Sequence, residues 1–447
     1  MTGPHPAVTT AEDARGPGGA GRAARRTVAL LVAFALISHF NRVSMATAGD
    51  TRVMAQYHLS PTRMGMVYSA FLLTYTACMI PGGLFIDRFR PRVALMAVGF
   101  GSALFVALTG VVGLVAREAS TAFAALLAVR GLMGAVSSPL HPACATAVGH
   151  WVPRGSRSRT NGLVNGAALV GIAVTPLAFG SLIDRFEWPG AFLIASCVTA
   201  GLAAVWSISV PAEPADGPNP DPAGVAPCET TGWRDLLTDR SLILVTLSYG
   251  AVGYFQYLFF YWMNYYFQNV LAIPGPTSRA YAAIPALAMA VGMPLGGWLS
   301  DRLERAAGTG RSRRIVPMAG MAAGAGLLVL GVFASEPFWI VTWFALALGA
   351  VGTAEGPFWV TAVELGGRRR GSSAALFNTG GNAGGMLAPV VTPWVGQNYG
   401  WGYAVGLGAL ICLAGVAFWL GVETGGDPNS PVPPRDPPRD AGRLASG

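Results

Sequence analysis

The sequence is dominated by long apolar blocks, each about as long as a helix that crosses a lipid bilayer. Such a helix needs about 20 mostly apolar residues to span the hydrocarbon core. Charged residues make up only 12% of the 447 positions, whereas an average soluble domain carries about 25%. The blocks therefore predict an all-α membrane protein with twelve transmembrane helices. The expected spans are residues 27–48, 62–84, 93–114, 122–148, 160–183, 190–210, 240–268, 278–300, 315–333, 338–365, 373–396 and 402–422.

The blocks fall into two groups of six, separated by a stretch rich in Pro, Gly and Asp at 211–239. That composition is typical of an extended linker. We therefore expect an N-terminal half at 27–210 and a C-terminal half at 240–422. Residues 1–26 are polar and lack the apolar core of a signal peptide, so they are expected to form a tail before an uncleaved first span. Residues 423–447 have the composition of the linker and are expected to form a disordered tail.

The two halves repeat one another in sequence. A Gly-Gly-x-x-x-Asp-Arg motif ends the second block at Gly82–Arg88 and recurs at the end of the eighth block at Gly296–Arg302. Asn165 of the fifth block has its counterpart in Asn378 of the eleventh at nearly the same offset. Matches that recur in order indicate two similar six-helix halves, a construction in which transported molecules bind at mid-membrane between the halves.

The basic residues indicate an orientation rather than a nucleic-acid partner. The chain carries 30 basic residues, all arginine, and a formal net charge of +8. If the N-terminus is cytoplasmic, most arginines fall in cytoplasmic segments, as the positive-inside rule requires. We therefore expect a multi-pass protein of the bacterial inner membrane with both termini in the cytoplasm. The arginines left in outer loops are Arg52, Arg63, Arg117, Arg185 and Arg279.

Catalytic and metal-binding patterns are missing from the sequence. The five cysteines show no close spacing of the kind that metal or disulfide chemistry uses. Nothing resembles an ATP-binding loop or a catalytic triad. We therefore expect no enzyme activity, no cofactor and no metal, and ion gradients or exchange as the driving force.

Four motifs resemble the major facilitator superfamily, and within it the anion:cation symporter family of sugar-acid and organic-anion transporters. They are Phe40-Asn41-Arg42, Ser69–Gly83, Arg130–Gly134 and Leu376–Gly385. The resemblance spans both halves. It implies two pseudosymmetric six-helix halves, secondary transport of a small organic anion by alternating access, possible coupling to protons, and a monomer.

Charges within the spans are candidates for substrate binding, because a charge at the bilayer centre costs about 2.5–3.5 kcal/mol on insertion scales. Arg42 and Arg130 lie about 6 Å and 7–8 Å to the outer side of their span centres, given the helical rise. Guanidinium groups bind carboxylates in bidentate fashion. The resemblance implies that both arginines line the cavity and hold the substrate carboxylate. The alternative is a structural arginine that satisfies backbone carbonyls at a kink.

The acids that this family usually carries beside these arginines are replaced by Asn41 and Ser137. The resemblance makes those acids the expected proton carriers, and since neither Asn41 nor Ser137 can titrate, the sequence does not predict proton coupling by the usual route. Glu355 occupies the position in the second half that corresponds to Ser137, and His39 and His141 can titrate near neutral pH. We expect Glu355 to carry the proton, with the two histidines as further candidates. A glutamate that caps a kinked helix, and structural histidines, are the alternatives.

Further polar residues within the spans suit a hydroxylated anion. The expected binding residues beside the arginines are Tyr75, Gln256, Tyr257, Asn378 and Asn382, with Tyr261 and Asn165 also able to face the cavity. The repeated motif predicts a cytoplasmic gate, in which glycines allow close helix packing and the acids approach helix N-termini. The expected gating residues are Gly83, Asp87, Arg88, Asp301 and Arg302.

Three other functions stay open at this point. A uniporter or anion exchanger of the same fold is favoured by the neutral Asn41 and Ser137. A drug/proton efflux carrier should have an apolar cavity, against which the two arginines argue. A membrane sensor without transport is disfavoured by the lack of a signalling domain after residue 422.

Overall fold

The computed structural model describes residues 17–153, 156–211, 237–307, 309–366 and 370–422. All regular structure in these ranges is helical, which confirms the all-α prediction. The predicted linker and the two predicted tails lie largely outside the described residues. The helices are α1 (Pro17–Ala48), α2 (Met54–Tyr57), α3 (Pro61–Ala77), α4 (Met79–Val115), α5 (Ala119–Ser137), α6 (Leu140–Trp151), α7 (Arg157–Ser209), α9 (Arg240–Tyr265), α10 (Gly275–Ala307), α11 (Thr309–Phe333), α12 (Pro337–Gly352), α13 (Glu355–Leu365), α14 (Arg370–Tyr399) and α15 (Trp401–Leu420).

Within the described ranges, nine helical stretches are long and apolar enough to cross a membrane. Twelve spans were predicted, and the difference comes from how the helices join. The stretch Arg159–Ser209 contains the fifth and sixth predicted spans, and α4 contains the third together with the end of the second. The remainder of the second span, α3, has 17 residues and is short on its own. The eleventh predicted span coincides with α14, which is not among the nine stretches.

Breaks in the backbone separate the joined spans. Arg90 in α4 and Glu187 in α7 have φ values of 66° and 55°, which no helical residue adopts. Arg90 directly precedes Pro91, whose ring disfavours helical geometry in the residue before it, and Glu187 lies two residues before Pro189. Two π-helical turns, Gly49–Val53 and Tyr266–Val270, extend α1 and α9. The first of them carries the helix beyond the predicted end of the first span.

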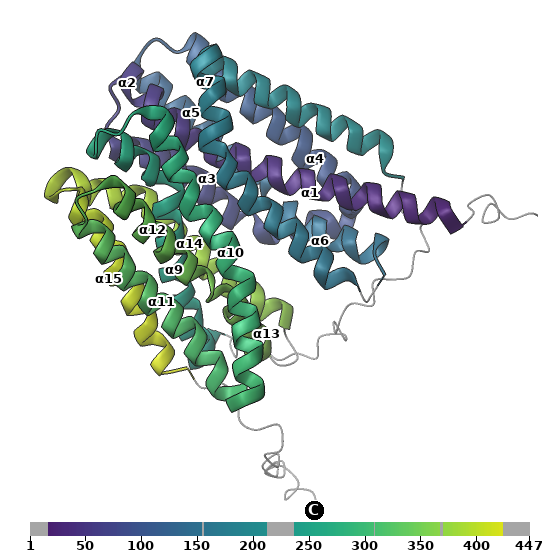
Figure 1. Ribbon diagram of the computed structural model, residues 1–447. Helices are drawn as coiled ribbons and strands as arrows, with labels where there is room; N and C mark the ends of the chain where they lie inside the picture. Colours follow the sequence, from purple (N-terminus) through teal and green to yellow (C-terminus); the bar gives the residue numbers. More distant parts are fainter. Residues whose placement is uncertain (1–16, 154–155, 212–236, 308, 367–369, 423–447) are drawn as a thin grey trace, which may run out of the picture.

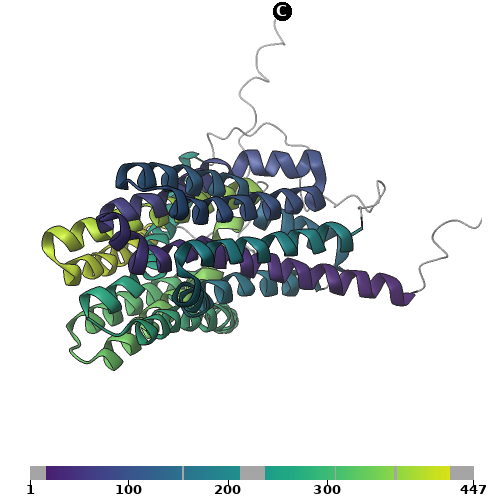
Figure 2. The same cartoon turned by 90° about the horizontal axis from the view of Figure 1, so that it is seen from above.

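The helices form two bundles, one from α1 to α7 and one from α9 to α15 (Figure 1). Within each bundle the helices run side by side, as the view from above also shows (Figure 2). Between the bundles, α3 packs on α14 and α7 packs on α10. The two bundles spread apart toward the ends that carry α6 and α13 (Figure 1).

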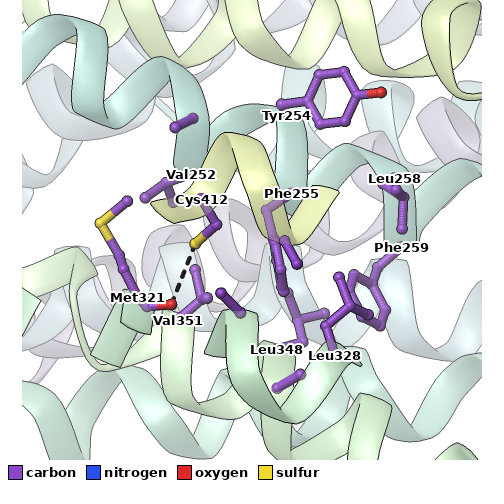
Figure 3. Packing of buried hydrophobic residues seen from close by; sticks show 14 of the residues in the cluster. Val252, Tyr254, Phe255, Leu258, Phe259, Met321, Leu328, Leu348, Val351 and Cys412 are labelled. Atoms are coloured by element: carbon purple, nitrogen blue, oxygen red, sulfur yellow. Dashed lines mark hydrogen bonds between the residues drawn. The ribbon is translucent and has the colours of Figure 1, made fainter. Parts of the chain in front are cut away.

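Each bundle has its own apolar packing. Figure 3 shows Phe255 and Phe259 of α9 packed with Leu328 of α11 and Leu348 of α12. In the same cluster the thiol of Cys412 donates to the backbone carbonyl of Met321 at 3.4 Å. Lipid tails are as apolar as these side chains, so close packing rather than water exclusion holds such helices together. Among the described cysteines, Cys144 and Cys412 are buried and serve as small packing residues, whereas Cys78 is half-buried and Cys197 is exposed.

The bundles contact each other mainly at one end, which we call the closed end. There Arg279 of α10 pairs with Asp184 of α7 at 2.6 Å, and Thr62 donates to Gln397 at 2.5 Å. A Cβ atom on Gly65 would lie 1.8 Å from the carbonyl oxygen of Pro389, so only glycine permits this approach. The bundles spread apart at the opposite end (Figure 1), toward which α10 runs from Arg279 to Asp301.

Candidate functional site

Arg42 projects from α1 into the region between the two bundles. Its guanidinium carbon lies 5.1 Å from each of the ring centroids of Phe71, Tyr75 and Tyr257. It also donates a hydrogen bond to the hydroxyl of Tyr257, which belongs to the other bundle. The side chain is 7% exposed, and none of the ion pairs between described residues includes it. Three ring faces thus stabilise a buried cation that has no protein carboxylate beside it.

Arg130 lies behind Arg42 and is fully buried. Its Nη2 donates to the backbone carbonyl of Arg42 at 2.6 Å, and its Nη1 donates to the carbonyl of Asn41 at 3.3 Å. The Nη1 atom also lies 3.2 Å from the sulfur of Met133. The structure therefore brings the two predicted arginines together but gives them different surroundings. Arg130 is bound to the helix that carries Arg42, as in the structural alternative for this residue.

Glu355 and Gln256 face each other within the second bundle. The Gln256 amide donates to one carboxylate oxygen of Glu355, and the hydroxyl of Tyr249 donates to the other at 3.0 Å. Glu355 is 6% exposed and is the first residue of α13, where a helix N-terminus stabilises negative charge. Gln256 is followed directly by Tyr257, the hydrogen-bond partner of Arg42. One turn of α9 therefore connects the buried acid with the buried cation.

Asn378 and Asn382 lie one turn apart on α14, as their spacing predicts. Both amide nitrogens contact the sulfur of Met79 at the start of α4, at 3.9 and 3.8 Å. The Asn382 amide also donates to the backbone carbonyl of Asn378 at 3.0 Å. The pair thus lies at the contact between the bundles and is not among the residues that contact Arg42.

His39 and His141 form a second cluster in the first bundle. Their ring centroids lie 5.1 Å apart with the planes at 66°. Both interact electrostatically with Arg42, and His141 is hydrogen-bonded to Asn165. His141 lies on α6, and a break between α5 and α6 separates it from Arg130.

The predicted gating residues lie where the bundles spread apart. Asp87, Arg88, Asp301 and Arg302 are all exposed. Each arginine lies over an aromatic ring of its own helix, Arg88 over Phe89 and Arg302 over Trp298, at 5.5 Å. The close approach expected of Gly83 is made by its neighbour Gly82, whose added Cβ would lie 2.9 Å from the Ser138 hydroxyl. An added Cβ on Gly83 would have no other atom within 4 Å apart from its own helix.

Two side chains of this region were not predicted from the sequence. Phe71 lies against both arginines, 5.1 Å from the guanidinium carbon of Arg42 and 5.3 Å from that of Arg130. Tyr249 donates to Glu355. Their spacing indicates that each shares a helix face with a predicted site residue, since Phe71 precedes Tyr75 by one turn and Tyr249 precedes Gln256 by two turns. An aromatic residue in a span is most often a packing residue, so the signal is weak.

Comparisons with known proteins agree with the predicted fold and with the predicted resemblance to organic-anion transporters. The chain matches the family described as Major Facilitator Superfamily over residues 30–379 and 311–445. It is 25% identical to the D-galactonate transporter of Escherichia coli O6:H1, over 90% of this chain and 95% of that protein. It is 24% identical to the probable sulfoacetate transporter SauU of Cupriavidus necator, over 84% of this chain and 90% of that protein.

A solved structure has the same fold. It is a bacterial homologue of the human lysosomal transporter Spinster in an inward-facing and unoccupied conformation. The TM-score is 0.72 at 16% identity, over 90% of this chain and 95% of that one. Identity this low carries information on the fold alone. The predicted twelve-helix fold of two six-helix halves is therefore confirmed.

Proposed function

The chain belongs to the major facilitator superfamily, and from that membership we propose that it is a secondary transporter of a small organic anion. The observation that carries the proposal is Arg42, a buried guanidinium caged by three aromatic rings with no carboxylate partner among the described residues. A buried charge is costly unless it is paired. An anionic ligand would supply the missing partner.

The chemistry around Arg42 supports a carboxylate or sulfonate as the anionic group. Its Nε is buried without a partner, while one terminal nitrogen donates to Tyr257. A guanidinium offers five N–H donors in a planar fork, so donors remain for the oxygens of a ligand. Of the named substrates of the two relatives, D-galactonate carries one carboxylate, and sulfoacetate carries a carboxylate and a sulfonate. We propose that Arg130 acts by positioning the helix turn of Arg42.

Side chains of the second bundle would bind the part of the substrate that Arg42 does not contact. Gln256 and Tyr257 are partly exposed; the Tyr257 hydroxyl accepts from Arg42, and the amide of Gln256, one residue earlier on α9, donates to Glu355. Asn378 and Asn382 lie against Met79 in this conformation, and a small separation of α14 from α4 would free their amides. We propose that these groups bind hydroxyls of the anion. A site that hydrogen-bonds hydroxyls discriminates strongly against analogues that lack them.

Transport would proceed by alternating access, with the two bundles rocking around the bound anion. The contacts between the bundles at the closed end support this proposal, since Asp184–Arg279 and Thr62–Gln397 belong to different bundles. The distribution of arginines supports a cytoplasmic position for the opposite end and for both termini. The conformation would then be inward-facing, with the repeated Asp-Arg motifs acting as the cytoplasmic gate when that end closes.

Proton coupling would depend on Glu355. The positions at which the family usually carries acids hold neutral residues with neutral partners, since Asn41 donates to Thr199 at 2.8 Å and Ser137 lies 3.3 Å from the Ser102 hydroxyl. Glu355 is buried and accepts hydrogen bonds from Gln256 and Tyr249. We propose that it carries the coupling proton, with His39 and His141 as the next candidates.

A second candidate is a uniporter or anion exchanger of the same fold, and the neutral pair Asn41 and Ser137 favours it. Both candidates share the Arg42 site and differ in whether a proton moves with the anion. A pH gradient imposed on proteoliposomes distinguishes them, because only the symporter is driven by it.

The test of the proposed function is ligand binding by the purified protein. Thermal unfolding should be measured with D-galactonate, other hydroxy acids, aromatic acids and sulfonates, together with neutral and cationic compounds of the same size. A ligand that binds only the folded state raises the unfolding temperature. We expect stabilisation by one class of anion in the wild type and none in Arg42→Ala. Stabilisation by cationic or neutral drugs instead would support an efflux carrier and overturn the proposal.

A further inference from the structure

Asp50 is a buried acid to which the proposed transport cycle assigns no role. The first span was predicted to end at residue 48, which left Asp50 in a loop. In the structure the helix continues through the π-helical turn Gly49–Val53 and then α2. This continuation carries Asp50 into the protein, where it is 6% exposed. The residue lies at the closed end, where the two bundles meet.

Both bundles surround the Asp50 carboxylate. From α3 of the first bundle, the Tyr68 hydroxyl lies 3.3 Å from Oδ1. From α9 of the second bundle, the Asn264 side chain and the backbone N–H of Tyr265 face the carboxylate. A Cβ on Gly49 would lie 2.1 Å from the Tyr68 hydroxyl, so the glycine allows Tyr68 to reach this position. The acid is therefore enclosed by groups that would separate if the closed end opened.

No cation compensates this acid within the described part of the chain. The ion pairs there do not include Asp50, and Arg52 on the same turn lies 3.9 Å from Asp184 and from Glu187 instead. The titratable groups facing Asp50 are the phenols of Tyr68 and Tyr265. Oδ2 is buried without a partner. Burial without a cation raises the pKa of the Asp50 carboxyl well above its ordinary value.

Two cavities lie near Asp50 at the closed end. A cavity of about 250 Å³ is lined by residues of both bundles, among them Thr47, Arg52 and Gln268. A second cavity of about 20 Å³ is lined by Thr47 and Asn264. The smaller volume is enough for one water molecule. Thr47 lines both cavities, and the smaller one reaches Asn264, a partner of Asp50.

We propose that Asp50 is a proton-binding site whose occupation stabilises the conformation that is closed at this end. The inference rests on the proposed alternation between two conformations but not on the identity of the anion. When this end opens, Asn264 and Tyr265 move away with the second bundle and water hydrates the carboxylate. Asp50 then binds its proton weakly, so a proton taken up from this side favours closure.

The direction of the pH dependence follows from linkage. The closed conformation has the higher pKa and therefore binds more protons, so acidification favours it and alkalinisation favours opening. With one proton involved, the ratio of closed to open protein changes by at most about tenfold per pH unit. The change is confined to pH values between the ordinary pKa of an aspartate in the open state and the raised pKa in the closed state.

The test measures the conformation of the protein without any substrate. Spin labels should be attached through Glu118→Cys and Glu336→Cys, in protein whose native cysteines are replaced by alanine, in lipid nanodiscs. Both positions are exposed and precede α5 and α12, one in each bundle at the closed end. The fraction of short distances should rise as the pH falls in wild type and should not depend on pH in Asp50→Asn. Asp50→Glu should keep a pH dependence.

Asp184→Asn provides the matched control. It removes an acid of the closed end that pairs with Arg279, so it should lower the closed fraction at every pH and keep the slope. A wild type whose distances do not change with pH, or an Asp50→Asn variant with the wild-type slope, would overturn the proposal. Failure of the anion-binding proposal would leave these distances unchanged, because no anion is present. The two proposals therefore fail independently.

Discussion

The guanidinium of Arg130 donates from Nη2 to the backbone carbonyl of Arg42 at 2.6 Å. One buried arginine thus fixes the turn of α1 from which the other projects. This relationship separates the roles of two residues that occupy similar depths in the membrane. The Arg42 side chain projects into the region between the bundles, whereas Arg130 lies behind Arg42 and is fully buried.

Arg130→Ala should therefore lower stability more than Arg42→Ala does. Loss of its charge-assisted bonds to the carbonyls of Asn41 and Arg42 should cost about 2–4 kcal/mol. Arg42 has no such backbone partner in the described residues, so Arg42→Ala should leave the unfolding temperature near that of the wild type. Thermal unfolding of both variants without ligand checks this. Equal losses of stability in the two variants would contradict the separation of roles.

Arg42→Lys should bind the substrate anion much more weakly than the wild type, since a lysine cannot form a bidentate pair. Arg42→Ala should lose about 2–5 kcal/mol of binding free energy, as expected when one partner of a buried charged contact is removed. Tyr257→Phe removes one hydroxyl and should cost about 0.5–1.5 kcal/mol. Isothermal titration of the purified variants measures all three. A Tyr257→Phe loss as large as that of Arg42→Ala would place the binding energy elsewhere.

Gly65→Val should prevent the closed end from closing, because an added Cβ would lie 1.8 Å from the carbonyl oxygen of Pro389. The variant should populate the conformation that is open at this end and should transport poorly. The Glu118–Glu336 label pair reports the expected longer distance. Gly201→Val is the control, since an added Cβ at Gly201 would have no atom of another helix within 4 Å. If both variants show the wild-type distance, the Gly65 contact does not limit closure.

Arg279→Asp should lower the population of the closed conformation, because it places two acids beside each other on different bundles. The change should be only a few-fold, since Asp184 is 48% exposed and pairs of this kind contribute about 0–1 kcal/mol. The double variant Asp184→Arg with Arg279→Asp should restore part of the loss. Restoration is the informative result, because a double variant as poor as Arg279→Asp would mean that the pair does not act as a latch.

The spans and the halves could be predicted because apolar length and motif repetition survive in a single sequence. The roles of particular side chains could not. The depth of Arg130 in its span was accessible from the helical rise, but the direction of its side chain depends on packing against α1. The same limit applies to Gly82 and Gly83, of which only Gly82 faces a neighbouring helix.

Residues at irregular turns were the hardest to interpret. Asp50 lies on the π-helical turn Gly49–Val53 that continues α1, and a span boundary set from hydropathy at residue 48 excluded it from the predicted helix. Glu355 was found because it is a charge within a predicted span and corresponds to Ser137 of the first half. Its partner Tyr249 comes from α9, and only the three-dimensional structure brings it to α13.

Glu355→Gln tests proton coupling. Glutamine keeps the size of the side chain and removes the titratable group, so uptake driven by a pH gradient should be lost while exchange of one anion for another persists. Proteoliposomes with and without an imposed gradient separate the two activities. Equal stimulation by the gradient in wild type and variant would assign the proton to another group, and His39→Gln and His141→Gln are the next variants to measure. A wild type without stimulation would identify a uniporter or exchanger.

The central claim is that Arg42 holds an organic anion that the protein carries across the membrane. The most direct measurement is the uptake of radiolabelled D-galactonate and sulfoacetate, in parallel, into proteoliposomes that contain wild type, Arg42→Ala or no protein. The account predicts saturable uptake of at least one anion by the wild type, competed by the unlabelled anion, and uptake by Arg42→Ala at the level of empty liposomes. Saturable uptake by Arg42→Ala equal to that of the wild type would contradict it.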